Sequence, residues 1–332
     1  MNTLIVLPGP SPVATFSAPK LSARRPALEG RAAVFKAVRN YFDEQGFLEV
    51  ETPVRVTNPG QEFHLDAFYA EGGRYLITSP EHHMKRLVGA GYDRVFQLCR
   101  CFRTEEQGPH HQPEFTMAEW YRARAPLEQI ADDCEALLQV AALAVGNEAP
   151  VRAARTTVAE LMRLHAGVNL AGDETAAELG QKLRTAGHDP RGAKTWDDLF
   201  FQVFLDHVEP ALKLGPPTFV FDWPAPLAAL ARKKPGATSW AERFELYAQG
   251  LELANAFGEL TDPVEQRARF EAEARLRGQR DKVVYPVDEK LLAALSTMPP
   301  TSGVAMGMDR LVMWALGSDD IRDVVAFPDD EV

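Results

Sequence analysis

The stretch that most constrains the fold is residues 94–121, RVFQLCRCFRTEEQGPHHQPEFTMAEWY. Apolar and polar residues alternate in its first part and again over residues 114–120, and a polar turn with Gly and Pro lies between them. Alternation of period two is typical of a β-strand, whose side chains point to opposite faces in turn. The stretch therefore predicts a β-hairpin whose second strand shows, on one face, Phe115, Met117 and Glu119.

The connection of this hairpin carries a candidate nucleotide site. Arg103 and Glu105 are two residues apart, so we expect them to point the same way. A guanidinium beside a carboxylate, an aromatic ring and His111 is suited to a nucleotide, because Arg binds phosphate and the ring stacks on the base. The alternative is a surface hairpin with an ordinary ion pair, and the spacing alone favours that alternative.

A second hairpin is predicted over residues 242–257, ERFELYAQGLELANAF, with its turn at Ala248-Gln249-Gly250. Glu245 and Glu252 lie on either side of the turn, where they can approach each other. Two carboxylates facing one cavity repel unless a proton or cation lies between them. Mg²⁺ with ATP phosphates is one occupant; two solvated glutamates on an edge strand are the alternative.

A third informative stretch is PTSGVAMGMDRLVMWALG, residues 300–317. Gly303 and Gly307 allow close approach of the backbone, and Asp309-Arg310 begins a helix with apolar residues at helical spacing. Taken alone, this glycine pattern is a weak signal.

The rest of the chain supplies elements around these stretches. Helical spacing predicts a helix over 28–45 that ends at Gly46, and FLEVETP follows as a strand. FHLDAFYA (63–70) alternates and predicts another strand, and Ser79-Pro80-Glu81 begins a helix with a carboxylate in its first turn. Residues 126–215 are mostly helical in pattern and carry no chemical constellation, so we expect a structural insertion there, and a flexible tail over 1–26.

Composition limits the function classes. The 332 residues are 45% hydrophobic and 25% charged, as in globular proteins, and no apolar run approaches the length of a membrane span. Three cysteines fit a reducing cytoplasm, and their spacing to the histidines matches no usual zinc site. A net charge of −11 argues against an extended nucleic-acid footprint. We attribute to a local ATP site the basic residues near the first hairpin: Lys85, Arg86, Arg94, Arg100 and Arg103.

Together the three stretches resemble the class II aminoacyl-tRNA synthetases. FRTE with its loop and Phe115 resembles motif 2, the helix and FLEVETP strand resemble the dimer-forming motif 1, and GVAMGMDR resembles motif 3. HQPEFTMAEWY and LANAFGELTD are close to the lysyl branch. The resemblance implies an α+β class II catalytic fold over residues 27–332, an antiparallel sheet flanked by helices, without the anticodon-binding OB domain.

The resemblance also implies roles for individual residues. In ATP binding it implies Arg103, Thr104, Glu105, His111, Gln112, Phe115, Glu245, Leu246, Gly307 and Arg310. In the amino-acid pocket it implies Ser79, Pro80, Glu81, Glu119, Tyr121, Glu252, Asn255, Glu259, Gly303 and Ala305. Arg103 and Arg310 would act in catalysis on the phosphates, and Glu245 and Glu252 would hold Mg²⁺. The chain departs from the family pattern mildly, at Pro109, Gln112 and Ala256.

A lysyl-type chain without an OB domain is similar to the ligase family that joins β-lysine to a lysine of elongation factor P. Ala305 fits that family, since lysyl-tRNA synthetases are expected to have Gly there. The resemblance implies ATP and Mg²⁺ as cofactors, lysine or (R)-β-lysine as substrate, elongation factor P as acceptor, a homodimer, no anticodon-type tRNA binding and no membrane. Alternatives are a ligase that charges tRNA or a tRNA-like acceptor, a non-catalytic regulatory paralogue, and an amide synthetase with a free amino-acid product.

Overall fold

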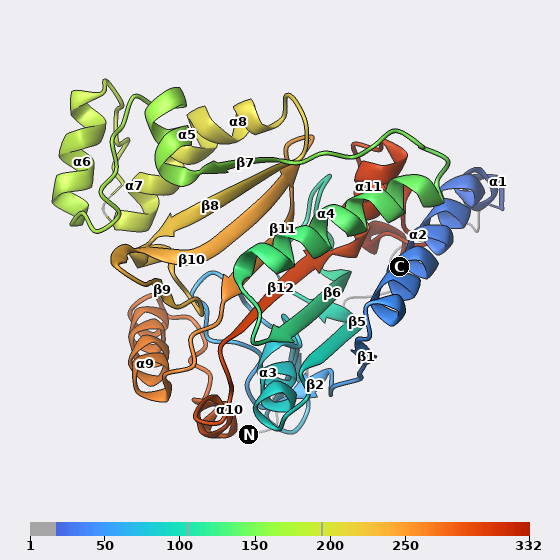
Figure 1. Ribbon diagram of the computed structural model, residues 1–332, viewed down its shortest axis with the longest axis horizontal. Helices are drawn as coiled ribbons and strands as arrows, with labels where there is room; N and C mark the ends of the chain where they lie inside the picture. Colours follow the sequence, from blue (N-terminus) through green and yellow to red (C-terminus); the bar gives the residue numbers. More distant parts are fainter. Residues whose placement is uncertain (1–17, 105, 194) are drawn as a thin grey trace, which may run out of the picture.

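The computed structural model describes residues 18–104, 106–193 and 195–332. Its centre is a nine-stranded sheet with the order β1-β5-β6-β12-β11-β10-β8-β7, and β9 (Lys233–Lys234) pairs with β10 (Figure 1). Neighbouring strands are antiparallel except at the two ends, where β1 pairs with β5 and β7 with β8 in parallel. The α+β fold with a largely antiparallel sheet is thereby confirmed.

Both predicted hairpins are present in this sheet. β5 (Arg94–Phe102) pairs with β6 (Glu114–Ala123), and β10 (Ala237–Ala248) pairs with β11 (Leu251–Gly258). The turn between β10 and β11 has Gln249 at φ 54° and Gly250 at φ 79°. Two successive residues with positive φ are characteristic of the tight turns that match the twist of antiparallel strands.

Alternation along the strands divides the central sheet into two faces. On β6, Ala118 and Trp120 lie in the main hydrophobic core, and β12 (Thr301–Gly307) adds Val304 and Met306 to the same core. Three helices cover this face, namely α2 (Arg25–Glu44), α4 (Leu127–Ala144) and α11 (Met308–Leu316) (Figure 1). The residues between the core positions point to the other face and are free to build a site.

A buried ion pair ties this helical layer to the sheet. Arg122 of β6 donates two hydrogen bonds of 2.7 Å to Asp133 of α4, and Tyr41 of α2 donates one of 2.6 Å to the same carboxylate. Trp120 contributes a further donor from its indole. Because every oxygen of Asp133 is satisfied, the buried charge is compensated and fixes the orientation of both helices.

Helices α5 (Val158–His165), α6 (Ala176–Thr185), α7 (Trp196–Val203) and α8 (Glu209–Leu212) gather beside β8 (Thr218–Pro224) and have a hydrophobic cluster of their own (Figure 1). A π-helical turn (Phe204–Val208) joins α7 to α8. Each of α5, α6 and α7 begins with a threonine capping box, which satisfies orphan N–H groups at the helix start.

β7 (Ala154–Thr157), at the edge of the sheet, was not expected from the sequence. Since α4 belongs to the main core, we infer that the insertion starts after it rather than at residue 126.

The N-terminal region differs in part from the expected tail. Residues 1–17 of the predicted 1–26 tail lie outside the described part of the chain. Residues 18–23 form α1 (Ala18–Ala23), and α2 starts at Arg25, before the expected Leu28. Arg24 is paired with Glu331 at 2.6 Å, so this part is attached to the C-terminal end and is not a loose tail.

The strand expected over residues 63–70 is wrong except at its end. Only β3 (Tyr69–Ala70) is a strand, paired with β4 (Arg74–Leu76), which also pairs with β2 (Arg55–Val56). The backbone carbonyls of Glu62 and Leu65 instead accept hydrogen bonds of 2.9 Å from the guanidinium of Arg277. Because Arg277 occupies these two carbonyl groups, they are not available to accept hydrogen bonds from a neighbouring strand. The motif 1 strand is also short, since β1 (Leu48–Glu49) covers two residues.

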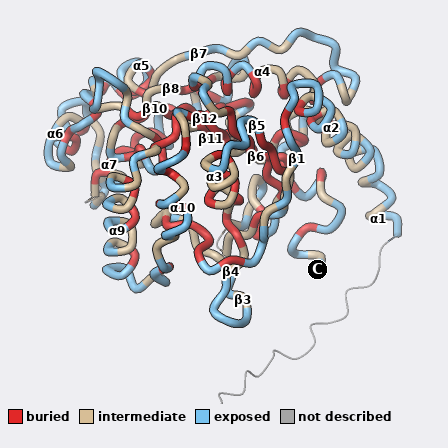
Figure 2. The backbone as a smooth tube through the Cα atoms, turned by 60° about the horizontal axis from the view of Figure 1, so that its bottom comes forward, coloured by how far each residue is buried: buried red, intermediate tan, exposed pale blue. Residues whose placement is uncertain are grey.

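The lower end of the sheet in Figure 1 is closed by α3 (Glu81–Gly89), α9 (Pro263–Gln279) and α10 (Glu289–Leu295). Together they enclose a third cluster of apolar side chains with Tyr121. The β3–β4 hairpin projects as an exposed loop, whereas the central strands are buried (Figure 2). No helix in the described ranges is long and apolar enough to cross a membrane.

Candidate active site

The sheet face opposite α4 borders a cleft of about 700 Å³. Strands β6, β10, β11 and β12 form its floor with alternate residues, and the start of α3, the β5–β6 connection and the segment from α7 to α8 form its walls. Residues from all three informative stretches of the sequence therefore meet in one space. Of the predicted residues, these line it directly: Ser79, Glu81, Arg103, His111, Gln112, Phe115, Glu245, Glu252, Asn255, Ala305, Gly307 and Arg310.

One end of the cleft has the chemistry of a nucleotide site. Arg103 follows β5, its guanidinium carbon is 5.0 Å from the centre of the Phe115 ring, and its Nη1 is 2.9 Å from the Glu106 carboxylate. An aromatic face beside a guanidinium suits a base next to phosphates. Glu105, expected to bind the adenine amino group, lies outside the described residues.

Arg310 reaches the same end from the first turn of α11. It donates hydrogen bonds to the backbone oxygens of Glu252, at 2.7 Å, and His110, at 3.2 Å, and it contacts the ring of His111. Burial and the Arg310 charge lower the pKa of His111, so that imidazole is neutral at pH 7. Arg310 is held in place by three partners before any ligand binds.

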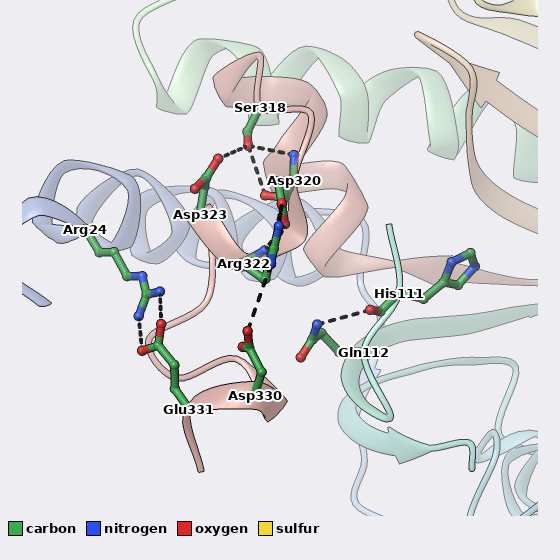
Figure 3. Close-up of polar contacts among 9 residues, drawn as sticks. All are labelled: Arg24, His111, Gln112, Ser318, Asp320, Arg322, Asp323, Asp330 and Glu331. Carbon is green, nitrogen blue, oxygen red and sulfur yellow. Dashed lines mark hydrogen bonds and ion pairs between the residues drawn. The ribbon is translucent and has the colours of Figure 1, made fainter. Parts of the chain in front are cut away.

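Gln112 is anchored to the C-terminal segment. Its Oε1 accepts the backbone N–H of Asp329 at 2.8 Å, and its Nε2 donates to the His111 carbonyl at 3.1 Å. Figure 3 shows this segment beside the loop, held by the pairs Arg24–Glu331 and Arg322–Asp330. Gln112 therefore faces the cleft while its amide oxygen supports the loop rather than a ligand.

Two predicted nucleotide residues do not line the cleft. Thr104 donates both its N–H and its hydroxyl to the Asp66 carbonyl, at 2.9 and 3.3 Å, which ties the loop to the segment before β3. The side chain of Leu246 is fully buried in the main core. Any contact of Leu246 with a nucleotide would have to come from its backbone.

Glu245 and Glu252 interact electrostatically across the second hairpin. Burial and the Glu252 charge raise the pKa of Glu245 to about 7. Both Glu245 oxygens already have donors, Arg243 and the Tyr247 hydroxyl. Within the described ranges no group of three His, Cys, Asp or Glu side chains is arranged to hold a metal ion by itself, so a cation here would need phosphate oxygens as well. Two carboxylates that repel each other, together with phosphate oxygens, form a ligand set that suits Mg²⁺. Glu252 is the better placed of the two to bind the ion, because both oxygens of Glu245 already accept hydrogen bonds.

The other end of the cleft is built on buried carboxylates. Glu119 of β6 accepts hydrogen bonds of 2.6 Å from the Ser79 hydroxyl and from the Tyr121 hydroxyl. Burial and the nearby Glu81 carboxylate raise the pKa of Glu119 well above its ordinary value. Pro80 is buried at the start of α3, where the Ser79 hydroxyl accepts the Glu81 N–H at 3.1 Å. Ser79 therefore joins the helix start to the sheet.

Of the five basic residues attributed to the ATP site, Arg103 lines the cleft, whereas Lys85, Arg86, Arg94 and Arg100 do not, so the attribution is wrong for these four. Lys85 differs most from the expectation. Its side chain does not reach the nucleotide end: it is buried on α3, in ion pairs with Glu81 and, at 2.6 Å, with Glu259. Burial, offset only in part by Lys85, raises the pKa of Glu259 to about 7. Lys85 follows Glu81 by four residues on one helix, which is the spacing of an intrahelical ion pair and the signal that sequence reasoning missed.

Gly303 and Ala305 lie on β12 beside these acids. Gly303 is paired with Tyr121 across the strands, and a Cβ added to it would lie 2.3 Å from the Tyr121 ring and 2.6 Å from a Glu259 oxygen. Only glycine fits there. Ala305 packs partly buried against a small cluster that includes Phe115 and Met117.

Two further groups were not anticipated. Arg243 alternates with Glu245 and Tyr247 on β10, and it also donates to Asn255 at 3.1 Å and to the Leu227 carbonyl at 2.6 Å. The period-two pattern of β10 already predicts that Arg243 lies on the same face as Glu245.

Residues 126–215, expected to be a structural insertion, also form part of the cleft wall. The wall residues from this segment are Asp197, Phe201, Phe204, Leu205 and Glu209. Only the tertiary fold brings them to the site.

Comparison with known proteins places the chain in a family. The family model of the class II tRNA synthetases (D, K and N) matches residues 18–331. The chain is 41% identical over 318 residues to the elongation factor P–(R)-β-lysine ligase of Klebsiella pneumoniae strain 342, covering 92% of this chain and 96% of that protein. It is 42% identical over 307 residues to the enzyme of the same name from Erwinia tasmaniensis, covering 90% and 93%, and 40% identical over 316 residues to that of Salmonella typhi, covering 92% and 96%. The chain therefore belongs to the class II tRNA synthetase family of the D, K and N type, and within it to the elongation factor P–(R)-β-lysine ligases.

Proposed function

We propose that this protein activates (R)-β-lysine with ATP and transfers it to the ε-amino group of a lysine on elongation factor P. The observation that carries the proposal is the cleft in which Arg103, Phe115 and Arg310 stand at one end and Ser79 and Glu81 at the other. Two buried carboxylates lie behind this second end: Glu119 is hydrogen-bonded to Ser79, and Glu259 shares Lys85 with Glu81. The names of the relatives, at about two-fifths identity over nearly the whole chain, support the same acceptor and amino acid.

In the first step a carboxylate oxygen of the amino acid attacks the α-phosphorus, the bond to pyrophosphate breaks, and an acyl-adenylate forms. Arg103 neutralises charge at the α-phosphate, and Arg310 does so nearer the terminal phosphate. Phe115 stacks on the base. Glu252 and Glu245, with help from phosphate oxygens, would hold Mg²⁺, which would supply further charge neutralisation. Positioning and electrostatic stabilisation carry the reaction without a protein nucleophile.

In the second step the acceptor amine attacks the activated carbonyl, AMP leaves, and an amide bond forms. The carboxylates Glu81, Glu119 and Glu259 bind the ammonium groups of the diamine, because a desolvated charge needs a partner. Ala305 sets the space beside the substrate amine. A difference of one methyl group in such a pocket supplies about 1–3 kcal/mol of discrimination, enough to favour the β-amino isomer.

A non-catalytic regulatory role is the second candidate, since paralogues of synthetases can lose activity. The retained set of Arg103, Glu245, Glu252 and Arg310 favours catalysis. Three unpaired cysteines suit a reducing cytoplasm, which we propose as the location.

The test is ATP–pyrophosphate exchange without RNA. We expect exchange driven by (R)-β-lysine, weaker exchange with α-lysine, and none without a lysine isomer. An absolute requirement for tRNA would refute the proposal, and so would ATP binding with no exchange under any condition.

We further propose a homodimer, in which α2 and β1 form the interface as the motif 1 resemblance implies. Leu48 of β1 is half exposed in the single chain, as an interface residue would be before assembly. Light scattering at micromolar concentration should give twice the mass of one chain. A mass of one chain at every concentration tested would show that the dimer does not form.

A further inference from the structure

Lys85 is a cation enclosed among acids at the amino-acid end of the cleft. Its side chain is 1% exposed, and its ammonium forms ion pairs with Glu81 on its own helix and with Glu259 beyond β11. Burial lowers the pKa of Lys85, but the charges of Glu259 and Glu81 more than offset this effect, so the pKa lies above the ordinary lysine value and the group is charged at neutral pH. It is a fixed positive charge.

The acids around it are crowded. Glu81 lines the cleft, Glu259 is 1% exposed, and Glu119 is 2% exposed. Glu119 is occupied by the hydroxyls of Ser79 and Tyr121, which leaves Glu81 and Glu259 as the acids that share the lysine. Three carboxylates so close together cannot all remain ionised in a dry pocket without a compensating charge.

The geometry points to Lys85 as a positioning residue of the amino-acid pocket: a built-in counter-ion that favours the ionised form of Glu259 and holds Glu81 and Glu259 in place to receive the two ammonium groups of a diamine. The inference rests on the proposed function and deepens it. Lys85 touches neither substrate nor ATP and acts through the two carboxylates. An uncharged residue there would leave the carboxylates repelling each other, so one would take up a proton and stop accepting an ammonium.

The groups that set the ionisation of Glu259 come from several elements. α3 contributes Lys85 and Glu81, β6 contributes Tyr121, and the segment before β9 contributes Arg232, whose charge favours the ionised form. Burial raises the pKa of Glu259 to about 7 even with Lys85 present. Removing Lys85 takes away the largest opposing effect, so the pKa of Glu259 rises further and the carboxylate ionises only at higher pH.

The experiment is the pH profile of (R)-β-lysine-dependent pyrophosphate exchange in wild type and in Lys85→Met, a variant of similar volume without charge. We expect kcat/KM for the amino acid to fall roughly tenfold or more at pH 7, mostly through KM, and the acid limb of the profile to move up by about one pH unit or more. The KM for ATP should change little. Lys85→Arg should restore the acid limb toward that of wild type, and Lys234→Met, which removes a lysine from a half-exposed pair with Asp222, is the matched control.

Glu259→Gln keeps the inference testable if Lys85→Met does not fold. This variant leaves Lys85 paired with Glu81 and should abolish the titration responsible for the acid limb. An unmoved limb in Lys85→Met, or a normal limb in Glu259→Gln, would overturn the inference while wild-type exchange stays intact. Absence of exchange in the wild type would instead refute the proposed function, so the two failures can be told apart.

Discussion

Replacing Arg103 by Ala is expected to slow (R)-β-lysine-dependent pyrophosphate exchange by roughly a hundredfold or more, because it removes a charge-assisted contact that is strongest in the transition state. The side chain lines the cleft 5.0 Å from the Phe115 ring and forms an ion pair with the partly exposed Glu106. Its loss should therefore lower kcat more than it raises the KM for either substrate. The measurement is exchange under saturating ATP and amino acid.

Arg100→Ala is the matched control, since Arg100 lies three residues earlier. Its half-exposed side chain is 3.5 Å from the equally exposed Glu114 carboxylate, an arrangement that contributes little to stability. We expect wild-type exchange in that variant. A near-normal rate for Arg103→Ala would mean that the phosphates bind elsewhere and that the nucleotide end of the cleft has been misplaced.

The second large effect is expected at Gly303. An alanine Cβ there would lie 2.3 Å from the Tyr121 ring and 2.6 Å from a Glu259 oxygen, and neither side chain is free to retreat. Tyr121 is bound to Glu119, and Glu259 is bound to Lys85. Displacing these groups by a fraction of an ångström to one ångström should reduce amino-acid-dependent exchange about a hundredfold, with overpacking costing about 1–3 kcal/mol of stability.

Gly278→Ala serves as the control for Gly303→Ala. Gly278 lies in α9, has no positive φ, and an added Cβ would meet only a Val284 methyl at 3.8 Å. Alanine in a helix is favoured over glycine by about 1 kcal/mol, so this variant should keep its activity and melt at the same or a slightly higher temperature. Calorimetric ATP titration should show that Gly303→Ala still binds nucleotide. Normal exchange in Gly303→Ala would show that the pocket is not where Tyr121 and Glu259 meet.

Period-two alternation was sufficient to predict the two hairpins and the faces of their strands. In β6 it placed Phe115, Met117 and Glu119 together, because strand geometry leaves no other option. The same logic failed over residues 63–68, where Arg277, more than two hundred positions away in the chain, supplies the hydrogen-bond donors. Local patterns cannot report a partner that only the tertiary fold brings close.

Lys85 shows a second reason why a prediction from sequence can fail. Its position near the first hairpin predicts a role at the ATP site, but charge type alone does not distinguish a lysine that binds an anionic ligand from an internal counter-ion. The helical direction of α3 turns it toward Glu81 and Glu259 instead. Likewise, Phe201 and Glu209 reach the cleft only because the helices after α4 pack at the end of the sheet.

Intact-mass spectrometry of elongation factor P, after incubation with this protein, ATP, Mg²⁺ and (R)-β-lysine, tests the proposed transfer reaction itself. We expect elongation factor P to gain the mass of one β-lysyl group on a single lysine without any RNA, and Arg103→Ala protein to give almost no product. Unmodified elongation factor P, together with efficient aminoacylation of tRNA in a parallel reaction, would show that the acceptor is tRNA and not elongation factor P.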